Sequence, residues 1–503
     1  LSRQGIDGSW STFMIQVGNP GQGVYLLPNT LSNAGNSIWV VIPPGCTEIN
    51  QNVSDCAAKR GGMFVSNQST SWSTEKLPNY GLFSLETGNE EVQLGLSGNA
   101  YYGFDTIHLG LSGSGLPQVQ NQLVAGMATN DFWLGSLGIS PTTFNITNFD
   151  SPIPSLLGTL RSQKFVRSTT WGYTAGAVYQ SPSAVGSLTF GGYDSALFAA
   201  NASIVVSAGP NFSNDLLIAL QSITYDSYGS SPLLTNGTLV LIDSMVAEMW
   251  LPIEVCHAFE QAFNLTWNET HELYILDEKV HANLLAQNPT FTFTLGGSTS
   301  APGGQTIQIK FPYAAFDLNA TAPYAKLTNT VPYFPLKRAE NSSQYALGRA
   351  FLQEAYIIAD YDRSQFHVSQ ALFPDLGDLP KLTAIEPPKP GNNTTPEPRK
   401  DDKLSEGAIA GIAVAAVIVP FSIIAALVYV YRRRSDRQRK YKESQMALGM
   451  SSDVSELPIN PAPLGTQELL VDEKPGEVVG TVMAPELDAG FDRVELEAPH
   501  NSS

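Results

Sequence analysis

Short alternating runs of apolar and polar residues dominate the chain up to about residue 375. The runs are rich in Val, Ile, Thr and aromatic residues, and Gly, Pro, Asn or Asp bounds each of them. This pattern predicts β-strands, because successive side chains of a strand point to opposite faces of a sheet. We expect strands at residues 11–17, 37–42, 175–180, 187–190, 238–242, 290–295, 356–361 and 365–371.

Apolar residues at helical spacing are confined to a few segments. They predict helices at residues 153–164, 253–263 and 347–354, and the second of these places Ile253, Cys256, Phe259 and Phe263 on one face. A β-rich chain of this length is too large for one simple sandwich. The predicted fold class is therefore all-β with two lobes, residues 1–184 and 185–375.

Residues 407–431 show neither pattern, because they are apolar throughout and contain no charged residue. A helix of this length, at about 1.5 Å per residue, exceeds the roughly 30 Å thickness of bilayer hydrocarbon. We expect a transmembrane helix, with a buried core helix as the alternative. Residues 432–442 hold seven basic side chains and one acid. This positive flank predicts a single-pass type I protein with residues 1–406 extracellular or lumenal.

The segments on both sides of this span have biased compositions. Residues 376–406 are rich in Pro and predict an extended stalk, and residues 432–503 have the composition of a disordered cytoplasmic tail. The chain starts at Leu1 and not at Met, so we expect that a signal peptide has been removed.

The charge balance disfavours one class of partner, and the glycosylation motifs indicate a secretory location. The chain has 28 Lys and Arg against 46 Asp and Glu, a net charge of -18, which disfavours nucleic-acid binding. The density of N-x-[ST] acceptors suggests a glycosylated surface. The acceptors are Asn52, Asn67, Asn145, Asn201, Asn211, Asn236, Asn264, Asn268, Asn319, Asn341, Asn392 and Asn393.

Several ordered motifs resemble the pepsin-like aspartic proteases. They include the Trp-Val at residues 39–40, Gly-Phe-Asp-Thr-Ile at 103–107, the segment 186–198, Ile-Asp-Ser at 242–244 and the closing segment 347–368. The resemblance implies two β lobes that each contribute one catalytic Asp. The sequons, the stalk and the missing first Asp are similar to membrane-anchored fungal members, which implies a plasma-membrane location.

Catalysis of this type requires two neighbouring carboxylates that share one proton, because both cannot ionise together. In the second lobe Asp243 and Ser244 match the family's Asp-[ST]-Gly motif, but Met245 replaces the glycine. Asp243 is the remaining member of the pair. The alternative is that Asp243 only ends a strand and bonds its own turn.

The first lobe lacks the expected acid. Counting forward from residues 18–20 places Asn29 and Thr30 at the motif, with Leu31 in place of the glycine, whereas counting back from Trp39 places Ser32 there. The two counts differ by three residues and imply an insertion. No Asp or Glu occurs between Asp7 and Glu48, so neither count supplies a carboxylate.

The resemblance also suggests further cleft residues and a disulfide. Thr30, Ser244 and Met245 belong to the cleft, and Tyr101 and Tyr102 stand near the flap, whose usual tyrosine is missing; strand positions are the alternative for this pair. Cys46 and Cys56 look like the small disulfide loop that follows the first motif, which leaves Cys256 as a buried thiol.

We weigh three functions from these observations. The first is a monomeric membrane protein with an inactive peptidase-like ectodomain that binds peptide, protein or glycan in its cleft. The second is an active aspartic endopeptidase that uses Asp243 with an unrecognised acid. The third is a cell-surface sensor that signals through its tail. The motifs predict no cofactor and no metal site.

Overall fold

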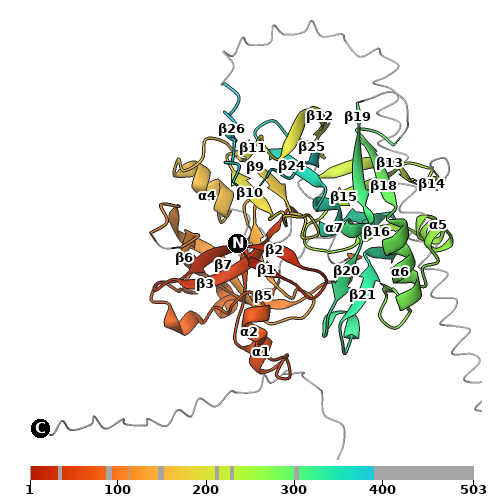
Figure 1. Ribbon diagram of the computed structural model, residues 1–503. Coiled ribbons are helices and arrows are strands. Elements are labelled where there is room, and N and C mark those ends of the chain that lie inside the picture. The colour runs from red at the N-terminus through yellow and green to blue at the C-terminus, as the bar shows by residue number, and fades with distance from the viewer. Residues whose placement is uncertain are drawn as a thin grey trace, which may run out of the picture. The chain divides into compact units, whose positions relative to one another are not determined.

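Strands form most of the regular secondary structure in the part of the chain that the structure describes (Figure 1). The computed structural model describes residues 2–389, apart from 32–36, 86–92, 112, 145–151, 210–214, 227–230, 300–304 and 376. All of them belong to the unit Leu1–Thr394. The predicted transmembrane helix at 407–431, the tail at 432–503 and most of the stalk lie outside the described residues. Within these residues, no helix has the length and apolarity needed to span a bilayer.

The first lobe is built on an eight-stranded sheet. Pairing of β2 with β6 closes this sheet on itself. In spatial order its strands are β1 (Ser2–Gln4), β2 (Trp10–Val17), β3 (Gln22–Asn29), β8 (Gly135–Gly138), β4 (Ile38–Val41), β7 (Gln118–Met127), β6 (Asn99–Leu109) and β5 (Leu82–Ser84).

The second lobe contains another eight-stranded sheet. Its strands are β19 (Thr306–Pro312), β18 (Thr290–Gly296), β13 (Leu217–Tyr225), β15 (Thr238–Ile242), β23 (Ala346–Leu347), β16 (Met249–Pro252) and β22 (Leu336–Ala339), with β14 (Ser231–Leu234) paired to β13. A small sheet of β17 (Tyr274–Ile275), β21 (Val331–Phe334) and β20 (Leu318–Ala320) accompanies it.

A five-stranded sheet takes strands from both halves of the chain. Its order is β10 (Ser187–Phe190), β9 (Thr170–Thr174), β24 (Ala355–Asp360), β25 (Gln365–Ala371) and β12 (Phe198–Ser207). Nearby, β11 (Gly192–Asp194) pairs with β26 (Leu382–Ala384), which lies inside the predicted stalk. The beginning of that segment is therefore attached to the β-structure.

The two large sheets repeat one local arrangement. In the first lobe β3 runs parallel to β8, and β8 runs antiparallel to β4. In the second lobe β15 runs parallel to β23, and β23 runs antiparallel to β16. The strands that lead into the two motifs, β3 and β15, thus have equivalent neighbouring strands in the two lobes. This repetition agrees with a bilobal fold.

Most of the predicted strands are confirmed. Residues 187–190, 238–242 and 365–371 are β10, β15 and β25, and the predictions at 11–17, 37–42, 290–295 and 356–361 match β2, β4, β18 and β24 within a residue. The strand predicted at 175–180 is wrong. The preceding strand, β9, already ends at Thr174. Gly176 has φ +74, a left-handed conformation that does not continue the extended backbone.

The helices are short and few among the described residues. They are α1 (Pro44–Thr47), α2 (Cys56–Lys59), α4 (Leu156–Ser162), α5 (Ile253–Phe263), α6 (Glu278–Gln287) and α7 (Arg349–Leu352), with 3-10 turns η1 (Ser66–Gln68), η2 (Pro78–Gly81), η4 (Tyr313–Ala315), η5 (Tyr324–Lys326) and η6 (Ser342–Gln344). The prediction at 253–263 is confirmed by α5. The prediction at 153–164 was too long, because the Ser155 side chain caps the helix by accepting from the N–H of Gly158. The prediction at 347–354 was also too long, because β23 occupies Leu347.

Candidate functional site

The loops that follow β3 and β15 meet through their motif residues. The Thr30 N–H donates to Ser244 Oγ at 3.0 Å, and the Ser244 N–H donates to Thr30 Oγ1 at 3.0 Å. Each hydroxyl also donates to a carbonyl near the end of the opposite strand, Thr30 to Ile242 O of β15 at 3.2 Å and Ser244 to Pro28 O of β3 at 2.6 Å. Four reciprocal hydrogen bonds therefore hold the two lobes together at this point.

The residues that precede Thr30 and Ser244 occupy equivalent positions. The N–H of Leu31 donates to Asn29 Oδ1 at 2.9 Å, and the N–H of Met245 donates to Asp243 Oδ1 at 2.7 Å. Asn29 is therefore the structural counterpart of Asp243 in the opposite loop. Ser32 lies outside the described residues. Asp243 also bonds its own turn, as the alternative interpretation of this residue expected.

These motif residues are fully enclosed. Asn29, Thr30, Asp243 and Ser244 are all 0% exposed. Leu31, at the position of the family's glycine, packs against Leu241 of β15. An apolar contact between the two lobes therefore lies beside the motif residues.

A cavity of about 440 Å³ lies beside the second loop and takes walls from both lobes. Asp7 and Asn130 come from the first lobe, whereas Met245, Glu248 and Trp250 come from the second. Its position at the junction of the lobes, next to the motif residues, makes it the candidate ligand site.

Lys337 and Glu248 in this cavity already have protein partners. The Lys337 ammonium lies 5.3 Å from the centre of the Trp250 ring and 3.9 Å from a carboxylate oxygen of Glu272. The Tyr324 hydroxyl donates to the carboxylate of Glu248. Burial, and then the charge of Glu248, raise the pKa of Tyr324 far above its ordinary value.

Comparison with known proteins identifies the fold. The family model described as eukaryotic aspartyl protease matches residues 12–371, which include both loops. The chain belongs to the eukaryotic aspartyl protease family. It is similar to candidapepsin from Candida tropicalis, with 24% identity over 355 residues that cover 70% of this chain and 77% of candidapepsin. The predicted pepsin-like fold is confirmed.

Met245 alters the second loop of this aspartyl protease domain. Its side chain is 7% exposed and belongs to the apolar cluster of the first lobe, together with Trp39, Tyr102 and Phe132. A glycine at this position has no side chain to place there. The methionine therefore fills space between the lobes beside Asp243.

Arg349 is a buried residue of the site that sequence reasoning missed. It is 2% exposed and begins α7. Its Nη1 donates to Ser244 O at 2.7 Å, its Nη2 lies 2.5 Å from Asp7 Oδ2, and its guanidinium lies 5.0 Å from the centre of the Trp10 ring. Arg349 thus ties the second aspartyl protease loop to the N-terminal segment. A single Arg in a segment predicted to be helical gave no sequence signal for this role.

Tyr101 and Tyr102 both lie in β6, so the strand alternative holds for the pair. Tyr102 is 0% exposed and its hydroxyl donates to Ser84 O at 3.4 Å. The Tyr101 ring lies 5.7 Å from that of Trp72. Neither tyrosine is among the described residues that line the cavity beside Met245.

The cysteine assignment is confirmed. Cys46 and Cys56 form a disulfide that joins α1 to α2, with Cα atoms 5.7 Å apart. Cys256 is a buried free thiol on α5. Burial raises its pKa to about 12, so it stays protonated and unreactive at neutral pH.

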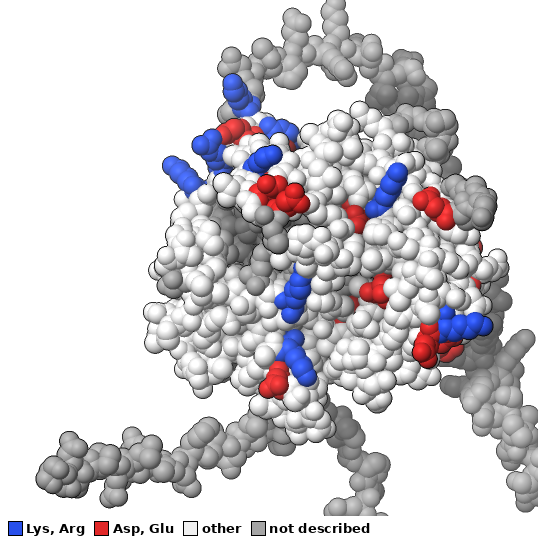
Figure 2. All heavy atoms as spheres, viewed as in Figure 1, with Lys and Arg blue, Asp and Glu red and all other residues white. Residues whose placement is uncertain are grey.

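The sequons that the structure describes are open to solvent. The exposed acceptors are Asn52, Asn67, Asn201, Asn236, Asn264, Asn319 and Asn341, and Asn268 is half-buried. Asn145, Asn211, Asn392 and Asn393 lie outside the described residues. The face of the molecule in Figure 2 is mostly uncharged, with basic and acidic side chains in small groups.

Proposed function

We propose that this aspartyl protease domain does not hydrolyse peptides and serves as a binding module. The observation that carries the proposal is the position of Asn29, which mirrors Asp243 in the opposite loop. An amide cannot ionise or share a proton as a second carboxylate does. The pair therefore has no state that holds both a base for water and an acid for the developing oxyanion.

The packing around Asp243 supports the same proposal. Met245 and Leu31 replace the two loop glycines and are buried, at 7% and 1% exposure. A substrate carbonyl and a water must reach the carboxylate together, and these side chains occupy the space around the motif. Restoring an acid at position 29 alone is therefore not expected to restore turnover.

The cavity beside Met245 remains as the ligand site. Its walls come from both lobes and combine the Trp250 ring with polar groups such as Asn130. We propose that it takes a segment of a peptide, a protein or a glycan. A ligand there makes contacts with both lobes without depending on catalysis at Asp243.

The proposal includes anchoring in a membrane, which rests on the sequence. Residues 407–431 form the span, the basic residues 432–442 remain cytoplasmic, and the described domain lies outside the cell. The exposed sequons fit this topology. Protease added to intact cells should remove the domain and spare the tail; loss of the tail with the domain intact would reverse the assignment.

Turnover of a peptide library between acidic and neutral pH tests the central proposal. The full chain, its Asp243→Asn variant and the control Asp226→Asn, which changes an exposed acid elsewhere, are purified in parallel. We expect equal, background rates from all three. Cleavage that only Asp243→Asn abolishes would show an active endopeptidase. The triple variant Asn29→Asp, Leu31→Gly, Met245→Gly should gain activity if these three positions are what silences the site.

A further inference from the structure

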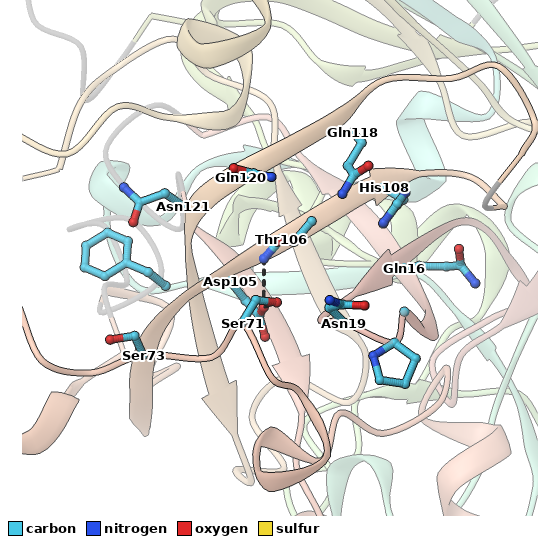
Figure 3. Close-up of a pocket in the computed structure, with 13 residues that line it drawn as sticks. Gln16, Asn19, Ser71, Ser73, Asp105, Thr106, His108, Gln118, Gln120 and Asn121 are labelled. Atoms are coloured by element: carbon cyan, nitrogen blue, oxygen red, sulfur yellow. Dashed lines mark hydrogen bonds between the residues drawn. The ribbon is translucent and has the colours of Figure 1, made fainter.

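A second cavity, of about 760 Å³, lies in the first lobe (Figure 3). It shares no lining residue with the cavity beside Met245. Its floor crosses three neighbouring strands, where Gln16 of β2 pairs with His108 of β6, and His108 pairs with Gln118 of β7. Figure 3 shows Gln118 and His108 next to each other along this row. We refer to this cavity as the amide groove.

The strands under the amide groove separate polar from apolar side chains. Val17, Ile107 and Val119 alternate with the groove residues and are buried in the core, at 0%, 0% and 1% exposure. The β6–β7 register shifts between Asp105 and Ile107, and Asn121 has φ 58. This bulge places two residues of β7, Gln120 and Asn121, opposite Thr106 of β6, and all three line the groove. Bulges often aim side chains at functional sites.

Hydrogen bonds hold the opposite rim in place. The N–H of Gly18 donates to Thr106 O at 2.9 Å, and the N–H of Asn19 donates to Ser69 Oγ at 3.0 Å. The N–H of Thr70 donates to Asn19 O at 2.8 Å. The groove is therefore formed before any ligand arrives, which lowers the entropic cost of binding.

Asp105 provides a buried acceptor in the wall of the groove. It is 1% exposed, and its Oδ1 accepts from Ser69 Oγ at 3.1 Å, Ser71 Oγ at 2.5 Å and the Thr106 N–H at 2.8 Å. Its Oδ2 accepts no hydrogen bond from the described residues. Asp105 therefore holds the two serines in place, and its second oxygen is enclosed by the protein and does not open into the groove.

Several groove side chains keep their hydrogen-bonding capacity for a ligand. Among the described residues, none bonds to the side-chain groups of Asn19, His108, Gln118, Gln120 or Asn121. Each amide offers two donors and an acceptor within one small group. The lining contains no Lys, Arg or Glu, so it lacks the cations that recognise phosphate or carboxylate ligands.

We propose that the amide groove binds a neutral glycan. Vicinal hydroxyls of a sugar both donate and accept, which matches paired amides, the His108 imidazole and the serine hydroxyls. The volume falls in the range of about 300–1,000 Å³ that is usual for ligand sites. A peptide added as an extra strand is not accommodated, because β2, β6 and β7 already have neighbours on both sides.

The glycan has two possible sources. Asn67 is exposed and is the acceptor of the sequon that ends at Ser69, whose hydroxyl bonds both Asn19 and Asp105 at the rim. A glycan on Asn67 therefore begins two residues from the groove wall. The other source is a free or cell-surface oligosaccharide, and the two are separated by experiment.

The test uses the full chain made in a secretory host, in a detergent without a sugar headgroup. In the first arm, the Asn67→Gln variant is screened by saturation-transfer difference NMR against mannotriose, cellotriose, laminaritriose and triacetylchitotriose. In the second arm, hydrogen exchange at residues 104–109 and 117–122 is compared between wild type and Asn67→Gln. Binding of a trisaccharide, or slower exchange in the glycosylated wild type, supports the proposal and names the source.

Matched variants locate the site. Gln118→Ala with Gln120→Ala removes two groove amides. It should weaken trisaccharide binding at least tenfold, or abolish the exchange protection, because the hydrogen bonds of both amides to the sugar are lost together. Asn283→Ala with Gln287→Ala, on the exposed side of α6, should change neither. Silence in both arms, binding of tetraglycine in place of sugar, or equal effects of the two double variants would overturn the proposal.

Discussion

Replacing Arg349 by methionine should destabilise the junction between the second loop and the N-terminal segment. The substitution keeps an apolar stem of similar length but removes the guanidinium from three contacts. These are the hydrogen bond to Ser244 O at 2.7 Å, the ion pair with Asp7 and the position over the Trp10 ring at 5.0 Å. The Asp7 carboxylate, 17% exposed, loses its cationic partner.

The expected loss in free energy of unfolding is about 3 to 4 kcal/mol. Breaking a buried ion pair from one side costs roughly 3–5 kcal/mol, chiefly because a charge is left without a partner. The partial exposure of Asp7 allows water to solvate its carboxylate and places the estimate toward the lower end of that range. Asp7→Asn in the Arg349→Met background should then cost little more, because its partner is already gone, so that the pair shows a coupling of about 2 kcal/mol.

Urea unfolding of the full chain, followed by tryptophan fluorescence, measures these values. Arg167→Met is the control, because Arg167 forms an ion pair with Glu386 in which both side chains are more than half exposed, and this variant should match wild type. An Arg349→Met variant as stable as Arg167→Met would refute the reasoning. A double variant whose loss equals the sum of the single losses would show that Asp7 and Arg349 act independently.

Two further predictions concern packing and pH. Met245→Ala should lower the free energy of unfolding by about 2–4 kcal/mol, as a buried methionine truncation does; a loss below about 1 kcal/mol in the same urea assay would contradict its packing between the lobes. Burial raises the pKa of Glu354, which bonds Tyr179 and Gln370, from 4.5 to about 7. The folded state therefore favours the protonated acid. The contribution of Glu354 to the free energy of unfolding is complete below pH 4.5 and is lost as pH rises through 7. In a plot of the free energy of unfolding against pH, Glu354→Gln should remove that decline, which is on the order of 3 kcal/mol. Curves of the variant and the wild type that run parallel would argue against this prediction.

The strands were predictable where one face is buried and the other is solvated. In β18, Phe291, Phe293 and Leu295 are buried and alternate with half-buried threonines, so the period of two is visible in the sequence. The helix α6 was missed for the opposite reason. It buries only Val280 and Leu284 among its residues, too narrow an apolar stripe to show a helical period.

The candidate site was predictable in kind but not in detail. The sequence showed that the first lobe has no acid, yet it left Asn29 and Ser32 as alternatives, because an insertion makes residue counting ambiguous. Contacts across 214 residues, between Thr30 and Ser244, place Asn29 opposite Asp243. Arg349 was not found because its partners, Asp7 and Ser244, come from distant segments, and no local pattern marks a long-range ion pair.

The five-stranded sheet has a consequence for the order in which the chain becomes complete during synthesis. Thr174 ends β9, and its neighbour β24 begins at Ala355, so 180 residues are made between the two. At about 5–20 residues per second, β9 waits roughly 10 to 40 s for its partner. During that interval the edge of β9 is open to pairing with other chains. We therefore expect the nascent chain to depend on chaperones until β24 and β25 emerge.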